Sequence, residues 1–195
     1  MKATQVKGDI YWVGVKDWNL REFHGYATPY GSTYNSYLIM DDKITLVDGV
    51  KHYLSAENLA RIGSMVDFSQ IAYVVVNHVE MDHSGNIPEI MRLAPQAVIV
   101  TNAAGKQALE AHFDTAGWQY LLVKSGDSLS IGKRTLEFMT TPMLHWPDSM
   151  MTYVKEDKVL LSNDGFGQHY ASSALMVKDA PFDLVMENAK SYYAN

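Results

Sequence analysis

The 195-residue sequence lacks cysteine, long apolar runs and any cluster of basic residues. Without cysteine, disulfides, thiolate metal sites and a cysteine nucleophile are all excluded. The longest apolar runs, such as Ile71–Val76, are far too short to span a bilayer, and no secretory signal opens the chain. The net charge of -6 comes with no basic stripe for nucleic acid. We therefore expect a cytoplasmic protein, without a membrane or nucleic-acid partner, whose metal sites use His, Asp and Glu.

The pattern of apolar residues predicts one domain over residues 1–195, with a hydrophobic content of 47% and no repeat or linker. Strands are expected at Ile10–Val15, Tyr34–Met40, Lys43–Asp48, Ile71–Val76, Ala97–Thr101, Leu129–Ile131, Arg134–Thr140, Met150–Val154 and Lys158–Ser162. Helices are expected at His52–Val66, Asn86–Leu93, Ala103–His112 and Phe182–Tyr193. Because hairpins alternate with strand–helix crossovers, this order predicts a mixed-sheet α/β sandwich.

One short segment carries most of the chemical information. His78, Glu80, Asp82 and His83 lie within six residues, directly after the strand expected at Ile71–Val76. The carboxyl ends of strands are where α/β proteins usually build their sites. Side chains at this spacing converge only where the chain turns tightly, and the Ser-Gly pair that follows supplies a turn. The segment therefore predicts a metal site; the alternative is a polar loop that happens to contain two histidines.

Two later segments repeat this arrangement. His145 directly follows an expected strand and is confined between Pro142 and Pro147, and Asp164 follows the expected strand Lys158–Ser162. Each residue taken alone is more typical of a loop or turn. Three strand ends that each deliver a histidine or a carboxylate indicate one shared metal centre.

The combined pattern resembles the His-x-His-x-Asp-His signature of the metallo-β-lactamase superfamily, followed by a distant His and an Asp. Glu80 departs from it by replacing the second His. This variant is similar to the flavodiiron proteins (A-type flavoproteins, including flavorubredoxin), which reduce dioxygen to water or nitric oxide to nitrous oxide. Other matching stretches are Asp17-Trp18, Phe23–Gly25, Ser36–Ile39, Pro142–Tyr153 and Ser162–Tyr170. The resemblance covers nearly the whole chain and implies a metallo-β-lactamase-like αββα sandwich, incomplete at its C-terminal end.

The resemblance also implies a ligand set. One iron would be held by His78, Glu80 and His145, a second by Asp82 and His83, with Asp164 bridging the two. The family's last ligand, a His further downstream, has no counterpart because no His follows His169. Three carboxylates would offset three of the four charges of two divalent ions, which favours redox cycling at iron over zinc Lewis-acid chemistry.

Three further residues have expected roles near the metals. His24 and Tyr193 resemble the pocket residues that meet the substrate, where each could donate a hydrogen bond; simple packing is the alternative. Asp48 resembles a carboxylate of the superfamily that can orient a ligating imidazole through its other nitrogen. An ordinary turn residue at a strand end is the alternative for Asp48.

The resemblance implies a flavodoxin-like domain that carries FMN, but no phosphate-binding loop occurs in this sequence. We therefore expect a truncated chain that does not bind FMN and is inactive without an electron donor, such as rubredoxin or a flavodoxin-like domain. The small-molecule substrate would be dioxygen or nitric oxide, and the head-to-tail pairing of the family implies a homo-oligomer. Two alternatives stay open: a metal-dependent hydrolase of the superfamily, and a non-catalytic remnant that binds at most one metal.

Overall fold

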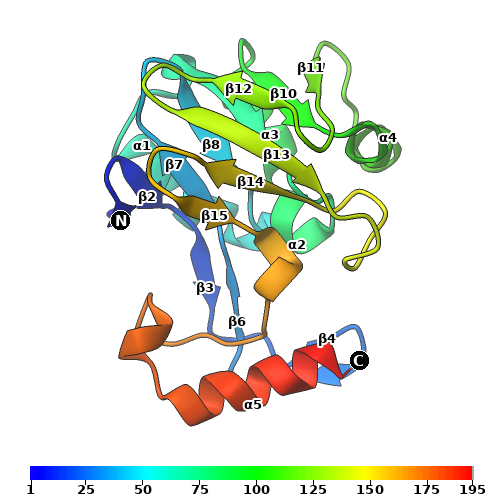
Figure 1. Ribbon diagram of the computed structural model, residues 1–195. Coiled ribbons are helices and arrows are strands. Elements are labelled where there is room, and N and C mark those ends of the chain that lie inside the picture. The colour runs from blue at the N-terminus through cyan, green and yellow to red at the C-terminus, as the bar shows by residue number, and fades with distance from the viewer. Residues whose placement is uncertain (195) are drawn as a thin grey trace.

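The computed structural model describes residues 1–194, which form two large β-sheets and five α-helices (Figure 1). The seven-stranded sheet contains, in spatial order, β1 (Thr4–Lys7), β2 (Ile10–Trp12), β7 (Tyr37–Ile39), β8 (Ile44–Val47), β9 (Ile71–Val75), β10 (Val98–Thr101) and β11 (Gln119–Leu122). The four-stranded sheet contains β12 (Ser128–Ser130), β13 (Thr135–Thr140), β14 (Met150–Val154) and β15 (Val159–Leu161). Strands β8 to β11 pair in parallel, whereas β1, β2, β7 and β8 pair antiparallel, so the larger sheet is mixed.

The helices are α1 (Ser55–Gly63), α2 (Met81–Ser84), α3 (Ile87–Leu93), α4 (Ala103–His112) and α5 (Phe182–Tyr193). Short 3₁₀ turns occupy η1 (His52–Leu54), η2 (Phe68–Gln70), η3 (Asn163–Phe166) and η4 (Val177–Asp179). Helix α4 begins where the side chain of Asn102 accepts a hydrogen bond from the Gly105 amide at 2.9 Å, which is an N-cap. None of the helices formed by residues 1–194 is long and apolar enough to cross a lipid bilayer.

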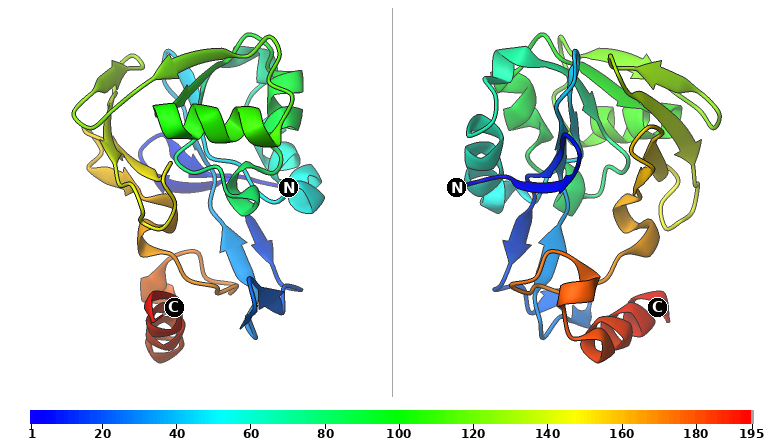
Figure 2. Two further views of the ribbon diagram at one scale, coloured as in Figure 1. Left: turned by 90° about the vertical axis from the view of Figure 1, so that its right-hand side faces the viewer. Right: turned by 60° about the vertical axis from the view of Figure 1, so that its left-hand side comes forward.

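The two sheets face each other, and α1, α3 and α4 cover the outer face of the larger one (Figure 2). Successive residues of a strand point to opposite faces, so Val74 packs towards the helices while Val75 packs between the sheets. Both faces of β9 are therefore buried, which is why its sequence is a continuous apolar run. Within residues 1–194, no helix lies on the outer face of the four-stranded sheet, so three layers are formed.

Two expected strands are each divided in two. Ile10–Val15 becomes β2 and β3 (Val15–Asp17), and Tyr34–Met40 becomes β6 (Ser32–Tyr34) and β7. The break lies at Gly14, where a Cβ atom would come within 2.2 Å of the Tyr34 carbonyl oxygen. The ribbon β3–β6 leaves the larger sheet there and extends towards α5 (Figure 1). It carries the small hairpin β4 (Glu22–Phe23) and β5 (Tyr26–Ala27).

Two further differences concern single elements. The helix expected at His52–Val66 is a 3₁₀ turn followed by α1, which ends at Gly63. Strand β11 was not expected, because its sequence carries no alternation and three of its four residues are exposed. As an edge strand it needs only one partner, β10, and its pattern therefore lacks the buried face that marks the inner strands.

Candidate metal centre

Asn77 joins three strand ends below the centre. Its backbone N–H and its side-chain amide both donate to the carboxylate of Asp48, at 2.7 and 2.9 Å. Its side-chain oxygen accepts from Thr152 Oγ1 at 2.7 Å, and its carbonyl accepts from the Met150 amide at 2.9 Å. Asp48 follows β8, Asn77 follows β9 and Met150 begins β14, so one saturated polar cluster holds both sheets together at this edge.

The segment after Asn77 turns at once into the short helix α2. The carbonyl oxygen of Glu80 accepts from the amides of His83 and Ser84, both at 2.9 Å, and Ser84 Oγ donates to the Val79 carbonyl at 2.6 Å. Gly85 ends the turn, since a Cβ there would lie 2.4 Å from the Met81 carbonyl oxygen. This tight turn directs the four closely spaced side chains of the sequence motif to one side.

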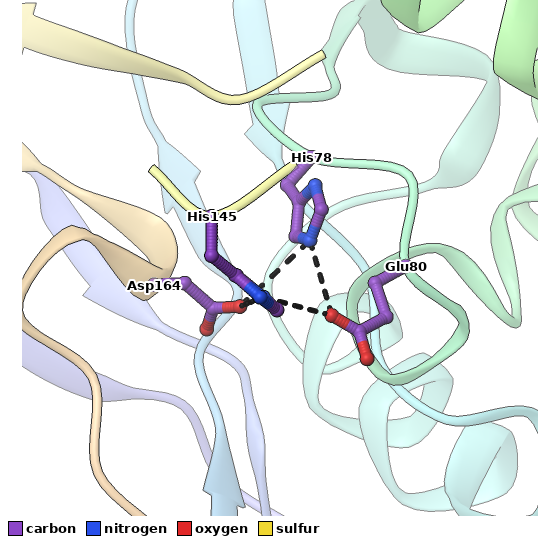
Figure 3. Close-up of side chains that lie close together, drawn as sticks. All are labelled: His78, Glu80, His145 and Asp164. Atoms are coloured by element: carbon purple, nitrogen blue, oxygen red, sulfur yellow. Dashed lines mark hydrogen bonds and ion pairs between the residues drawn. The ribbon is translucent and has the colours of Figure 1, made fainter. Parts of the chain in front are cut away.

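Four of the expected ligands converge on one point (Figure 3). The group consists of His78, Glu80, His145 and Asp164, and we call it the first group; one donor atom from each lies within 4.8 Å of the others. Glu80 Oε2 lies 3.2 Å from Nε2 of His78 and 3.1 Å from Nε2 of His145. Asp164 Oδ2 lies 3.3 Å from the same atom of His145. Such a set of two imidazoles and two carboxylates could hold a divalent ion.

The other two expected ligands lie beside the first group. We call Asp82 and His83 the second group: His83 Nε2 is 3.3 Å from Asp82 Oδ2 and 2.9 Å from Asp164 Oδ1. The two oxygens of Asp164 therefore face different groups. Asp82 Oδ1 is buried and makes no hydrogen bond with the residues that the structure describes, and His83 Nε2 is buried with only these ion-pair contacts among them. Buried polar atoms without a partner are costly, so this pair is suited to a cation that would satisfy both.

The charges of these residues are strongly coupled. Burial opposes protonation of His78, but its hydrogen bonds with Asp148 and Glu80 outweigh burial and raise the pKa of His78 to about 9. Burial likewise opposes protonation of His83, yet Asp164 and Asp82 raise its pKa to about 10.

The pKa values of two carboxylates of the centre, Glu80 and Asp164, shift in the opposite direction. Burial would raise the pKa of Glu80, but hydrogen bonds from His78 and His24 lower that pKa to about 2. Burial would also raise the pKa of Asp164, and the nearby His83 and His145 hold it well below its ordinary value instead. Glu80 and Asp164 are thus ionised over a wide pH range, as metal ligands must be, whereas burial raises the pKa of Asp82.

His24 reaches the centre from the tip of the β4–β5 hairpin. Both residues of its two-residue turn have positive φ, 48° at His24 and 83° at Gly25, which is the combination found in type I′ turns. The turn places His24 Nε2 2.5 Å from Glu80 Oε1, the carboxylate oxygen that faces away from His78. The His24 side chain is 58% exposed, so it stands at the opening of the centre.

The expected pocket residues His24 and Tyr193 line the same cavity of about 310 Å³, which reaches Glu80 and Asp164. The Tyr193 hydroxyl donates to the carbonyl oxygen of Gly165 at 2.9 Å. A second cavity of about 260 Å³ reaches His83 and Asp164. Asp82 and Asp164 line both cavities, whereas Glu80 and His145 line only the first and His83 only the second.

The expectation for Asp48 needs correction. Both carboxylate oxygens of Asp48 accept from Asn77, and no hydrogen bond joins it to an imidazole in the part of the chain described. The carboxylate that contacts a candidate ligand is Asp148, whose Oδ2 lies 3.1 Å from His78 Nδ1. Sequence analysis did not single out Asp148, because an Asp between Pro147 and Ser149 is typical of a turn. Its place three residues after His145 is the only signal for it.

The layered sheets and the histidine–carboxylate centre at one edge define a metallo-β-lactamase-like domain, which confirms the fold expected from the sequence. The model of the ODP family beta lactamase domain matches residues 33–195, and the chain belongs to this family. It is 47% identical over its whole length to a nitric oxide reductase of Moorella thermoacetica and 43% identical to a rubredoxin-oxygen oxidoreductase of Megalodesulfovibrio gigas, and covers 49% of each.

Solved structures agree. The flavodiiron protein from Giardia intestinalis matches with a TM-score of 0.97 and 41% identity over the whole of this chain and 48% of that one. Rubredoxin oxygen:oxidoreductase from Desulfovibrio gigas matches with a TM-score of 0.96 and 42% identity, over the whole of this chain and 49% of that one. The resemblance to the flavodiiron proteins is thereby confirmed, and the chain spans about half the length of the relatives it matches.

Proposed function

We propose that this chain is the di-iron domain of an oxidoreductase that reduces dioxygen to water, nitric oxide to nitrous oxide, or both. The observation that carries the proposal is the placement of Asp164, with one carboxylate oxygen directed at the first group and the other at the second. A carboxylate shared in this way is suited to two metal ions that act on one small molecule. The relatives named as a nitric oxide reductase and a rubredoxin-oxygen oxidoreductase support the reaction class.

The residues fit a pair of iron ions. The first group would hold one ion, the second group the other, and Asp164 would be shared between them. Three of the six donors are carboxylates, and the unsatisfied buried atoms of Asp82 and His83 face the second position. Oxygen-rich, histidine-containing sites suit iron, which would supply the electrons for reduction when bound.

The chain's own residues would control access to the centre. His24 Nε2 hydrogen bonds to Glu80 Oε1, and the residue lines the cavity of about 310 Å³, so its ring is held beside the first group. Tyr193 has its hydroxyl committed to Gly165, so its role there is to shape the cavity wall. Both residues thus belong to the cavity through which a small molecule reaches the centre.

The electrons would come from outside this chain. The relative from Megalodesulfovibrio gigas is named for rubredoxin, and flavorubredoxins of Salmonella share 44–45% identity over 97% of the chain. We propose rubredoxin or a flavodoxin-like domain carrying FMN as the donor, with FMN bound outside residues 1–195. A homo-oligomer in which one subunit's flavin meets another's metals would provide the route.

The test is metal analysis followed by a single turnover. The chain is produced anaerobically, loaded with iron(II) and desalted; we expect about two irons per chain. Because two iron(II) ions carry two electrons, two molecules of nitric oxide and two protons should give one nitrous oxide and one water, measured by gas chromatography. Preferential binding of zinc together with ester or thioester hydrolysis would support the alternative of a metal-dependent hydrolase. Binding of one metal ion or none would support the alternative of a non-catalytic remnant.

A further inference from the structure

The two ring nitrogens of His78 have different surroundings. The residue is 1% exposed, and its Nε2 faces Glu80 Oε2 at 3.2 Å within the first group. Its Nδ1 lies on the other side of the ring, 3.1 and 3.3 Å from the two oxygens of Asp148. The ring of Trp146 stands edge-on against the imidazole at a centroid distance of 5.3 Å. Burial and these contacts fix the ring, so only Nε2 is directed at the metal position.

Asp148 is itself held firmly. It is 3% exposed, and its Oδ2 also accepts from the Val79 backbone N–H at 2.7 Å. Its backbone carbonyl accepts from the side-chain amide of Asn102 at 2.6 Å, and the same Asn102 side chain caps α4. The carboxylate is therefore anchored to the metal-binding segment, and the backbone of Asp148 is anchored to the start of a helix. The carboxylate cannot turn away from His78 without breaking its hydrogen bond with Val79.

His83 has no such partner. Its Nδ1 is buried and makes no hydrogen bond with any residue that the structure describes, whereas its Nε2 forms an ion pair with Asp164 Oδ1 at 2.9 Å. The two buried histidines of the centre therefore differ in what fixes their proton and their orientation. Only His78 has a carboxylate on the nitrogen that points away from the metal position.

We propose that Asp148 is a positioning residue for the first metal position. Its carboxylate keeps the proton of a metal-bound His78 on Nδ1 and directs the Nε2 lone pair at the ion, which makes the first position bind metal more tightly than the second. Carboxylates that accept from a ligating histidine tune metal affinity in this way. The inference rests on the proposed two-metal centre, but it does not depend on which metal is bound.

The experiment compares Asp148→Asn with the unaltered chain in competitive titrations of Zn²⁺ or Co²⁺ against a chromophoric chelator. We expect the affinity for the first ion to fall by about 10–100-fold, with a much smaller change for the second. The matched control is Asp17→Asn. Asp17 is a similarly buried carboxylate that accepts hydrogen bonds from Tyr34, Tyr53 and two backbone amides, and it contacts no imidazole within the described residues. The Asp17→Asn variant should have a lower thermal stability than the unaltered chain but the same affinity for metal.

A spectroscopic measurement needs no variant. In the Zn²⁺-loaded chain, ¹H–¹⁵N correlation spectra of the imidazoles should show a downfield, exchange-protected Nδ1 proton on His78 and none of this kind on His83. Absence of that proton overturns the proposal even if Asp148→Asn does not fold. Unchanged first-ion affinity in a folded Asp148→Asn also overturns it. If the unaltered chain binds no metal at all, the proposed function fails instead, so the two failures are distinguishable.

Discussion

The two halves of the candidate centre, the first group and the second group, differ in how many of their side chains are held in place by other residues. The first group offers four donors, and two of them are held from behind: His78 by Asp148 and Glu80 by His24. The second group offers two donors of its own plus one oxygen of Asp164, and within residues 1–194 the buried atoms Asp82 Oδ1 and His83 Nδ1 make no hydrogen bond. The first half is preorganised for an ion, whereas the second half is incompletely satisfied.

This difference follows from where the donors arise. Each donor of the first group follows a different strand or begins a tight turn, and the Asn77 cluster locks the strand ends of both sheets beneath it. Asp82 and His83, by contrast, both lie on the single short helix α2. A site assembled from several fixed elements needs little rearrangement to bind, while adjacent residues on one turn enclose an ion from one side only. We therefore expect the two positions to differ in affinity and in sensitivity to substitution.

Removing the shared carboxylate should have the largest effect, because it damages both halves at once. In Asp164→Ala we expect iron to fall from about two ions per chain to nearly none, measured by elemental analysis after anaerobic loading. His83 and His145 would both lose their contact with the carboxylate. The control is Asp179→Ala, an exposed residue of η4, which should keep both ions. Retention of one tightly bound ion in Asp164→Ala would show that the two halves are independent.

Single substitutions in each half should show that the two metal positions lose their ions independently. Glu80→Ala removes a donor from the first group. We expect this variant to lose iron while the fold persists, because Glu80 lies at the start of a turn and is not one of the apolar residues that form the core. His83→Ala should lose only the second ion. Met81→Ala, at the exposed position between them, serves as the control. Iron content and thermal unfolding are measured for all three; unchanged iron in Glu80→Ala would remove it from the ligand set.

Much of this centre is encoded locally and could be predicted. The strand ends before His78, His145 and Asp164 are marked by apolar runs that stop at polar or proline residues. Because sheet pairing brings such ends to one edge, the convergence of these residues followed from the order of elements. Glu80 needed the family pattern to be interpreted, since a carboxylate in a turn has no special meaning by itself.

The remaining features depend on contacts that no local pattern records. The chain bends at Gly14 because the Tyr34 carbonyl approaches from a distant strand. That bend brings the β4–β5 hairpin, and with it His24, to the centre. Asp148 acquires its role only through His78, which is 70 residues away. Asp48 was expected to orient an imidazole because it resembles a carboxylate of the superfamily, whereas Asp148 lies in a turn before β14 that carries no such pattern.

The smallest expected effect concerns the pH dependence of thermal stability, which should have opposite signs without metal and with metal. The folded-state pKa of His78 is about 9 and that of His83 about 10, above the ordinary value of 6.5. Their pairing with carboxylates therefore stabilises the chain fully below pH 6.5, and this stabilisation is lost as pH rises through about 9 and 10. With a chelator present, the midpoint of thermal unfolding should fall by several degrees over this range.

With Zn²⁺ bound the slope should be reversed, because an imidazole must lose its proton to bind a metal, so metal binding strengthens as pH rises. Midpoints are measured between about pH 6.5 and 9 with chelator and with metal. His78→Gln should flatten both slopes, while His112→Gln, at the exposed end of α4, controls for the loss of an imidazole elsewhere. Parallel slopes with and without metal would mean that these histidines do not exchange protons for an ion. The contrast between the two halves would then be one of packing alone.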